Sequence, residues 1–285
     1  MLNLGVEPPK LGAYGLIVDP LGSPNGLLVA PRTWQPWAFE FEMINESILE
    51  REEWSKASAV IRILPSGFAT INRSAARTTI ASSMVTRPEA LLHPYLGGTA
   101  VVVANWNGYL AFHASSFVYE GGVWGILGGK EHGKSSAVGW LLASGIPVFS
   151  DDVLVVADGV ARAGPRCIDL RESAAKHFGF GRDIGVIGNR RRWRVDLAHD
   201  VAPELPMRGW VTLEWSNDLC IRTCDAQERL AALHEHRAFR LRDDERPGSW
   251  LGAIALPMVS LARPREWSKV DLAMGLLLSS LSGPH

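Results

Sequence analysis

The stretch that decides the fold is Gly128-Gly-Lys-Glu-His-Gly-Lys-Ser135, which fits the pattern G-x-x-x-x-G-K-[ST] at every fixed position. Gly128 and Gly133 permit backbone conformations that other residues adopt only under strain, and they let the chain pass close to a ligand. The turn then points successive backbone N–H groups inward and forms a nest for anions. The sequence therefore predicts a phosphate-binding loop; the alternative is a glycine-rich turn that binds nothing.

The residues on either side of this loop match the strand–loop–helix setting that phosphate binding requires. The apolar run Val123–Leu127 predicts a buried strand before the loop. The pattern over Lys134–Ser144, stopped by Gly145, predicts a helix whose positive N-terminal end faces the ligand. We expect Lys134 to reach the β- and γ-phosphates of ATP and the Ser135 hydroxyl to hold Mg²⁺.

The predicted nucleotide-binding residues are the whole loop and the residue that follows it. Three of them occupy variable positions of the pattern, and we expect their side chains to face solvent: Lys130, Glu131 and His132. The complete set is Gly128, Gly129, Lys130, Glu131, His132, Gly133, Lys134, Ser135 and Ser136.

Two neighbouring acids, Asp151 and Asp152, follow the next predicted strand, Ile146–Ser150. A helix runs away from the loop and this strand returns, so in an α/β sheet the end of the strand lies near the loop. Adjacent residues at a strand end point to opposite sides. One carboxylate can therefore face a metal ion and the other an acceptor hydroxyl, whereas a solvated pair in a turn is the alternative.

The block from His113 to Asp152 resembles the catalytic core of HPr kinase/phosphorylase and its relatives, P-loop kinases akin in fold to phosphoenolpyruvate carboxykinase. His113, the loop and Ser150-Asp-Asp152 carry the resemblance. It implies that Asp151 is the catalytic base toward a serine hydroxyl, that Asp152 holds magnesium, and that His113 lies beside Asp151. Without the resemblance, His113 is a lone histidine at a strand end.

The resemblance extends to 164–171, which is similar to the acid–aliphatic–Arg segment of that family. Asp169 stands where the family has Glu, and Glu172 stands where it has Gly, so neither reverse phosphorolysis nor docking of HPr follows from the resemblance. Asp169 is a candidate further metal-site acid and Arg171 a candidate phosphate contact; surface ion pairs are the alternative. The chain is more similar to a wider HPr-kinase-like group that includes lasso-peptide serine kinases.

The predicted fold class is α/β, with a P-loop kinase core of the HPr kinase/phosphoenolpyruvate carboxykinase type over 93–285 and a smaller β-rich accessory domain over 1–92. The break at Pro88–Pro94 sets this boundary. Thr99–Ala104 is predicted as a strand and Asn107-Gly108 as a hairpin turn. The predicted helices are Glu46–Lys56, Leu170–Phe178, Ala226–His234 and Trp267–Leu281.

Composition narrows the class of protein. The 285 residues carry a net charge of −1, which favours neither nucleic acid nor an anionic membrane as a partner. Three cysteines, the absence of a signal-peptide pattern and the absence of a long apolar run predict a cytoplasmic protein. The basic run Arg190–Arg194 is a candidate contact for phosphate or acceptor, or a solvated strand entrance.

Together these features predict an ATP- and Mg²⁺-dependent kinase that phosphorylates a serine-type hydroxyl of a peptide or protein, such as a peptide natural-product precursor. One alternative is a small-molecule kinase acting on free serine or a similar metabolite. Another is a nucleotide-binding switch without kinase activity. The sequence leaves the oligomeric state, including a homo-oligomer, open.

Overall fold

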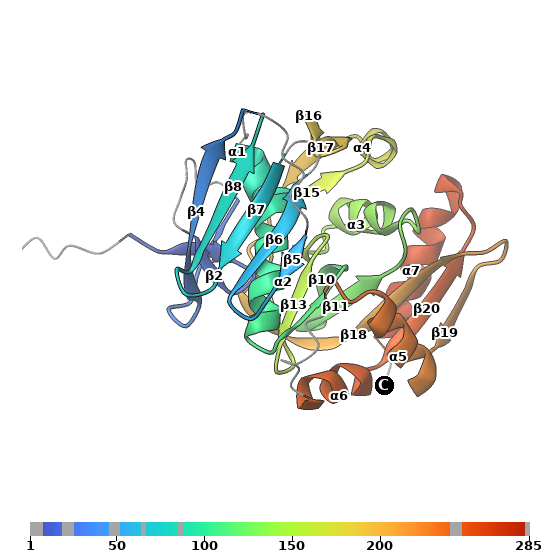
Figure 1. Cartoon of the computed structure of the whole chain (residues 1–285). Coiled ribbons are helices and arrows are strands. Elements are labelled where there is room, and N and C mark those ends of the chain that lie inside the picture. The colour runs from blue at the N-terminus through green and yellow to red at the C-terminus, as the bar shows by residue number, and fades with distance from the viewer. Residues whose placement is uncertain are drawn as a thin grey trace, which may run out of the picture.

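The fold contains two large sheets and a third, small one, and it is shown by a computed structural model that describes residues 8–18, 26–45, 52–63, 67–84, 88–239 and 247–282. The N-terminal strands form a sheet on one side of the molecule, and the predicted phosphate loop follows a strand of a second, central sheet (Figure 1). In the described part of the chain, no helix is both long and apolar enough to span a bilayer.

The N-terminal sheet has eight strands in the order β3-β1-β2-β4-β8-β7-β6-β5. In the strands Ser58–Ile63 and Gly67–Asn72, more buried and more exposed side chains alternate, as expected for a sheet with one covered face. The strands are β1 (Leu11–Ala13), β2 (Leu16–Val18), β3 (Leu28–Val29), β4 (Gln35–Met43), β5 (Glu53–Trp54), β6 (Ser58–Ile63), β7 (Gly67–Asn72) and β8 (Arg77–Ser82).

Helix α2 (Leu96–Trp106) packs between this sheet and the central sheet. A short α1 (Pro88–Ala90) and a π-type turn η1 (Leu91–Tyr95) precede it. One hydrophobic cluster joins side chains from the N-terminal sheet, from α2 and from the central sheet, where Ala111 and Val155 take part. The predicted division near residue 92 stays a prediction, and this shared cluster crosses it.

Two local predictions in this region are wrong. Thr99–Ala104 lies inside α2 and forms no strand. The helix is buried on nearly every side, so no polar face marks its 3.6-residue period, and a short apolar run cannot be told from a buried strand. Asn107-Gly108 ends this helix rather than turning a hairpin: the Asn107 N–H donates to Val103 O, and Gly108 has a φ of 72°.

The central sheet has the strand order β12-β10-β11-β18-β14-β13-β9, with β20 paired to β18 and β19 paired to β20. β11 runs parallel to β18, β18 runs parallel to β20, and β10 is antiparallel to both β11 and β12. β12, β11, β18 and β20 therefore end at one edge. The strands are β9 (Leu110–Phe112), β10 (Ser115–Tyr119), β11 (Gly122–Leu127), β12 (Val148–Ser150), β13 (Leu154–Ala157), β14 (Val160–Arg162), β18 (Glu204–Trp215), β19 (Cys220–Thr223) and β20 (Met258–Arg263).

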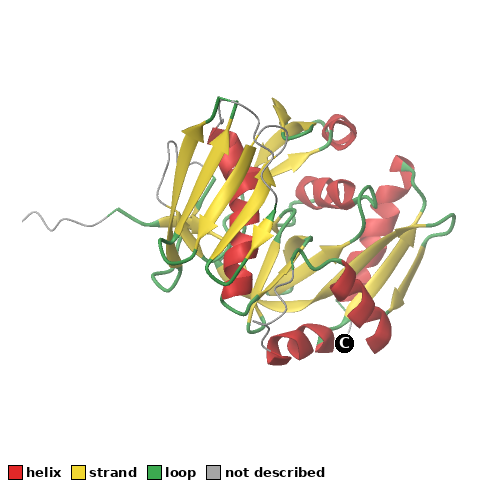
Figure 2. Cartoon of the chain, in the orientation of Figure 1, coloured by secondary structure: helices red, strands yellow, loops and turns green. Residues whose placement is uncertain are grey.

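Helices cover both faces of the central sheet (Figure 2). α3 (Lys134–Ala143), α4 (Glu172–Phe178) and α7 (Val270–Leu281) share one hydrophobic cluster with Trp124 and Ile126 of β11. α5 (Ala226–Glu235) and α6 (Pro247–Ala255) share the other with Val123 and Leu127. Alternate residues of β11 thus serve opposite layers, which explains why its sequence is apolar throughout.

The remaining predicted helices are confirmed with shifted limits or fall partly outside the description. Leu170 ends strand β15 (Cys167–Leu170), so α4 begins only at Glu172. β15 joins β17 (Arg190–Asp196) and β16 (Arg182–Ile187) in the small third sheet. A 3-10 turn, η2 (Trp267–Lys269), precedes α7.

The helix predicted over Glu46–Lys56 is wrong where the structure describes it. Residues 46–51 lie outside the described residues, and Glu53–Trp54 forms a strand.

Candidate active site

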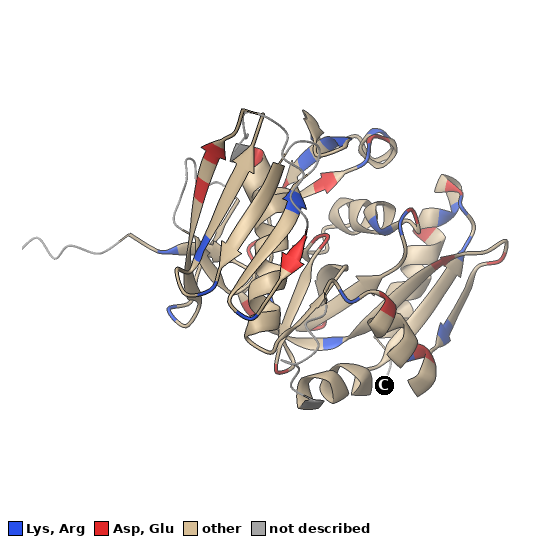
Figure 3. Ribbon diagram, viewed as in Figure 1, with Lys and Arg blue, Asp and Glu red and all other residues tan. Residues whose placement is uncertain are grey.

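Four strand ends of the central sheet meet at one cavity of about 620 Å³. β11 delivers the loop Gly128–Ser135, β12 delivers the acid pair Asp151 and Asp152, and β18 and β20 end at Trp215 and Arg263. This volume lies within the range of small-molecule and cofactor sites. Acidic and basic residues occur in both sheets (Figure 3). Both signs also occur among the residues that line this cavity.

The loop turns at Gly133, whose φ of 86° lies in the left-handed region. A Cβ atom at this position would lie 2.4 Å from Nη2 of Arg263 and 2.8 Å from the Trp215 ring, so both the conformation and the space require glycine. Arg263 Nη2 donates to Gly133 O at 3.1 Å. α3 begins at the next residue, Lys134, and the start of the helix therefore faces the cavity.

Lys134 folds back over the loop. Its Nζ donates to Gly128 O, and it lies 3.3 Å from Gly129 O. Burial lowers the pKa of Lys134, while the negative charges of Asp152 and Asp151 oppose that effect. The ammonium group is thus held inside the loop by backbone oxygens, where phosphate oxygens of a ligand could replace them.

Asp151 is held both through its carboxylate and through its backbone. The Ser115 hydroxyl donates to Oδ1 at 2.6 Å, and the Tyr14 hydroxyl donates to the backbone oxygen of Asp151 at 3.2 Å. Burial and then the charge of Asp152 raise the pKa of Asp151, although His93 and the Ser115 hydrogen bond act in the opposite direction. Its proton affinity is therefore higher than that of an ordinary aspartate.

Asp152 is placed differently, and its pKa moves the other way. His93 Nε2 lies 2.9 Å from Oδ2 as an ion-pair contact, and Arg190 Nη2 lies 3.5 Å from the same oxygen. Burial raises the pKa of Asp152, but His93 and then Arg190 and Arg192 outweigh it and hold this pKa below its usual range. Because the Asp152 side chain is 42% exposed, solvent screens these contacts.

The two acids are thus neighbours in sequence with opposite shifts of pKa. Asp152 also has a φ of 62°, an uncommon conformation for a residue with a side chain. Such strain is often found where a functional side chain must be aimed. Pairs of titratable groups whose pKa values are pushed apart are typical of sites that assign one group to proton transfer and the other to binding charge.

The histidine that contacts the acid pair is His93, which sequence reasoning missed. It lies in η1, within the segment read as a domain boundary, and its side chain is only 5% exposed. No local pattern marks it, because its partner is 59 positions away along the chain, as their residue numbers show. His113 lines the same cavity and donates its backbone N–H to His236 O at 2.7 Å; its role beside Asp151 stays a prediction.

Asp169 lies at the cavity wall with its carboxylate fully buried. Arg194 grips it from two sides, with Nε 2.5 Å from Oδ1 and Nη2 3.1 Å from Oδ2, and Arg192 Nη1 lies 3.3 Å from Oδ2. Both oxygens are committed to arginines, so a metal role would require breaking these contacts. Of the basic run, Arg190 lines the cavity, and Arg191 pairs with Asp183 on the outside.

The variable positions of the loop are partly as expected. Lys130 and Glu131 are exposed, whereas His132 is half-buried, with Nδ1 3.2 Å from Leu213 O. Glu131 ties the loop to its surroundings: its carboxylate pairs with Arg171 at 3.1 Å, and its backbone oxygen accepts from Trp215 Nε1 at 2.9 Å. These contacts connect the loop to β18 and to the start of α4.

A Mg²⁺ ion fits the oxygen donors at this site. Among the described residues, no three His, Cys, Asp or Glu side chains converge as a metal-ligand set. Magnesium in phosphoryl-transfer sites takes one or two carboxylates and completes its shell with substrate phosphates and water. Ser135 and Asp152 both line the cavity. His93 and Arg190 both contact Oδ2 of Asp152, so Oδ1 is the oxygen that can serve the ion.

Comparison with known proteins gives little further guidance. No protein-family model matches the chain, and no curated protein matches it. Among solved structures, the HPr(Ser) kinase/phosphatase from Coxiella burnetii aligns with a TM-score of 0.31 and 13% identity, over 60% of this chain and 95% of that chain. A likeness with this TM-score supports no conclusion about function. The function is therefore inferred from the geometry of the cavity.

Proposed function

We propose that this chain is an ATP-dependent kinase whose active site is the cavity at the ends of β11 and β12. The observation that carries the proposal is the meeting of a phosphate loop with two carboxylates of opposite pKa shift, Asp151 and Asp152. The resemblance of this segment to HPr-kinase-like enzymes is consistent with it.

The loop side of the cavity binds the polyphosphate. The backbone N–H groups of the loop and the start of α3 favour negative charge. Lys134 exchanges its contacts with Gly128 O and Gly129 O for phosphate oxygens, and it neutralises charge as it develops on the transferred group. Arg190 lines the cavity beside Asp152 and adds a second positive charge near the reacting end.

Ser135 and Asp152 would hold Mg²⁺. When bound, this ion would neutralise negative charge on the phosphates. His93 and Arg190 keep Asp152 ionised, because each stabilises its negative form. This low proton affinity suits a metal ligand, which must be deprotonated to bind.

Asp151 acts as the base. The acceptor hydroxyl gives its proton to this carboxylate as its oxygen bonds to the γ-phosphorus, and the bond from that phosphorus to the β–γ bridging oxygen breaks. ADP leaves with the bonding electron pair, and the product is a phosphate monoester. Ser115 holds Oδ1 of Asp151, so the other oxygen is the one that takes the proton. Asp151 returns the proton to solvent afterwards.

The acceptor in this proposal is a serine hydroxyl of a peptide or protein. The support is the resemblance to kinases that phosphorylate serine, including those of lasso peptides. Incubation with radiolabelled ATP and either serine-containing peptides or free amino acids distinguishes a peptide kinase from a small-molecule kinase. A protein that binds ATP yet labels neither class nor any protein of its native lysate would instead be a nucleotide switch.

Two substitutions test the active site. Asp151→Asn removes the base, and we expect turnover to fall by on the order of 10²- to 10⁴-fold while ATP affinity changes by less than about threefold. Lys134→Ala removes a group that contacts the phosphates, and we expect both turnover and affinity to fall. Single-turnover phosphate transfer and calorimetric titration with Mg-ATP measure the two effects. Full turnover in Asp151→Asn with the true acceptor would show that Asp151 is not the base.

A further inference from the structure

One side of the cavity has no task in the proposed reaction. Trp215 ends β18, Arg263 ends β20, and Arg265 and Trp267 follow closely along the chain. All four side chains line the same cavity as the phosphate loop. In the central sheet, β18 and β20 lie on one side of β11, whereas β12 with the acid pair lies on the other.

This strand order sets a direction across the site. If the γ-phosphate lies beside Asp151, as the proposed function requires, the rest of the nucleotide extends over the loop toward the ends of β18 and β20. We infer that Trp215, Arg265 and Trp267 form the subsite for the nucleotide base and hold it by stacking. This inference rests on the proposed function and adds the part of the substrate that the phosphate loop does not contact.

Trp215 is held rigidly at the junction of loop and subsite. Its Nε1 donates to Glu131 O at 2.9 Å, and its ring edge lies against Gly133. The guanidinium of Arg265 lies 5.8 Å from the ring centroid of Trp215, within the range of a cation–π contact. Bases stack on indole rings and on guanidinium planes, so this pair presents surfaces suited to a base.

Trp267 supplies a second planar surface that lines the same cavity. It stacks on His177 with ring centroids 4.1 Å apart and an interplanar angle of 16°, which fixes its orientation. The side chain nevertheless keeps 36% of its exposure and lines the cavity. This fixed and partly exposed indole is a planar surface inside the cavity that a base can cover by stacking.

Arg263 lies between the subsite and the loop. It is 1% exposed, its Nε has no hydrogen-bond partner among the described residues, and its guanidinium lies 4.8 Å from the ring centroid of Trp215. No acidic side chain of the described residues contributes to its charge environment. Burial lowers the pKa of Arg263 to about 10, so the group is still charged at neutral pH. A buried cation without a carboxylate favours an anion nearby, and the phosphates next to the sugar of a bound nucleotide would supply it.

Stacking sets an expectation for base preference. Planar groups bind every base through its π-face, and the larger face of a purine gives more contact than that of a pyrimidine. We therefore expect ATP and GTP to bind with similar affinity and CTP and UTP to bind more weakly. A subsite built for hydrogen-bond readout of adenine would instead separate ATP sharply from GTP.

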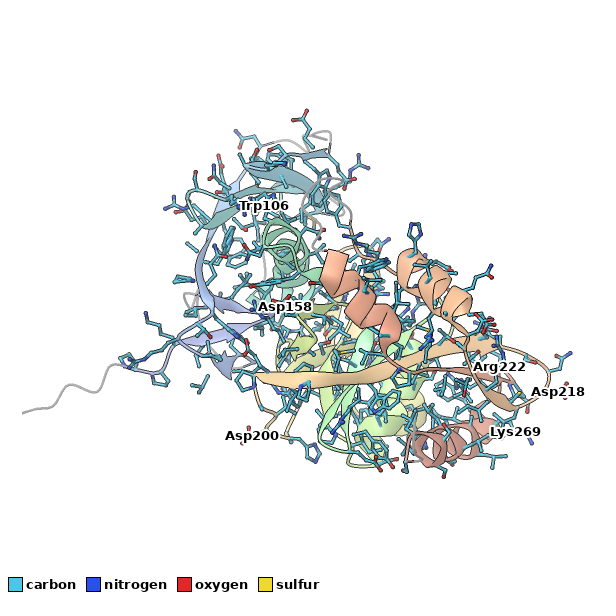
Figure 4. All side chains as sticks on the ribbon, turned by 90° about the horizontal axis from the view of Figure 1, so that it is seen from below. Trp106, Asp158, Asp200, Asp218, Arg222 and Lys269 are labelled. Atoms are coloured by element: carbon cyan, nitrogen blue, oxygen red, sulfur yellow. The ribbon has the colours of Figure 1, made fainter. Side chains whose placement is uncertain are left out.

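The test compares Mg-ATP with Mg-tripolyphosphate, which lacks base and sugar, by calorimetry on the full chain. We expect Arg265→Ala and Trp267→Ala each to weaken Mg-ATP on the order of tenfold and to leave Mg-tripolyphosphate within about twofold. Trp267→Phe keeps a stacking plane and retains most of the affinity. Arg222→Ala is the matched control: Arg222 is half-exposed on β19, pairs with Glu228, and lies near the outer end of the sheet (Figure 4).

Three results would overturn the inference. If the unaltered chain binds tripolyphosphate as tightly as ATP, the base has no subsite, although the result would still support the proposed phosphate site. If the variants lose affinity for both ligands equally, Arg265 and Trp267 act on the phosphates. If the unaltered chain binds neither ligand, the proposed function fails and the inference falls with it. Thermal melts of each variant exclude unfolding as the cause of a loss.

Discussion

Asp151 and Asp152 show how neighbouring residues of the same type acquire different chemistry. Burial dominates at Asp151, whereas the contacts with His93 and Arg190 dominate at Asp152. The difference arises from elements that are distant in sequence, since η1 contributes His93 and β17 contributes Arg190. At the residue scale, the site is therefore defined by which partners each carboxylate meets.

Ser115 offers a direct test of that view through pH. Its hydroxyl stabilises the charged form of Asp151 and so lowers the pKa of that carboxyl. Ser115→Ala removes this effect, and we expect the acidic limb of the turnover–pH profile to move to higher pH, because Asp151 must be ionised to accept a proton. Ser116→Ala is the control, since Ser116 bonds to Ser150 and not to Asp151. An unshifted limb in Ser115→Ala would mean that another group sets it.

Gly133 tests the loop backbone at the same scale. Gly133→Ala places a Cβ against Arg263 and Trp215 at a φ of 86°, and we expect loss of Mg-ATP binding together with lower stability. Gly145→Ala is the matched control, because Gly145 has a φ of 73° but nothing within 4 Å of a Cβ. Its cost should be only the conformational one, about 1–2 kcal/mol. Denaturant unfolding and calorimetry measure both; equal behaviour of the two variants would contradict the packing argument.

At the scale of elements, the small sheet β15–β17–β16 depends on a buried ion cluster. Asp169 on β15 holds Arg192 and Arg194 on β17, and each of these side chains is less than 10% exposed. Removing one partner of such a cluster leaves charge buried without compensation. The cluster therefore fixes the register of β15 against β17, where Asp169 stands opposite Arg194.

The substitution Asp169→Ala should lower the free energy of unfolding by about 3–5 kcal/mol, because two buried arginines lose their carboxylate. Asp183→Ala, which removes an exposed partner of Arg191, should leave the free energy of unfolding nearly unchanged, because solvent screens that pair. Denaturant titration gives both values. If Asp169→Ala kept its stability and instead lost affinity for Mg²⁺ with nucleotide, Asp169 would be a metal ligand, as the sequence first suggested.

The elements nearest the loop could be predicted from sequence, because their signals are local. β11, the loop and the helix that starts at Lys134 follow directly from the apolar run, the glycines and the position of Gly145. Helix α2 could not be recognised, since it is buried on nearly all sides and has no polar face. Trp215 and Arg263 could not be identified because only the strand order of the folded sheet brings them to the loop, and His93 could not because it reaches Asp152 from η1, far away in sequence.

At the scale of the whole molecule, the N-terminal sheet is part of the wall that supports the site. Its Tyr14 donates a backbone N–H to Ala163 O and its hydroxyl to Asp151 O. Helix α2 is apolar around its circumference and is covered by this sheet on one side and the central sheet on the other. The two parts therefore depend on one hydrophobic core.

Residues 93–285 alone should consequently fail to fold as a stable monomer, because the fragment exposes the face of α2 that the N-terminal sheet covers. We expect aggregation, or a broad melt by circular dichroism without a cooperative transition, whereas the full chain should unfold in one transition seen equally by far- and near-ultraviolet signals. A soluble monomeric fragment with a sharp melt and retained Mg-ATP affinity would show two independent domains.

The antiparallel strand β10 has a further consequence for how the chain tolerates change. β10 begins at the cavity with Ser115 and ends at the opposite edge of the sheet. There Glu120 and Gly121, both exposed, form the turn into β11. A Cβ on Gly121 would meet open space. This hairpin tip is thus a natural attachment point for an affinity handle or a fluorescent reporter, far from the chemistry yet joined to it by a single rigid strand.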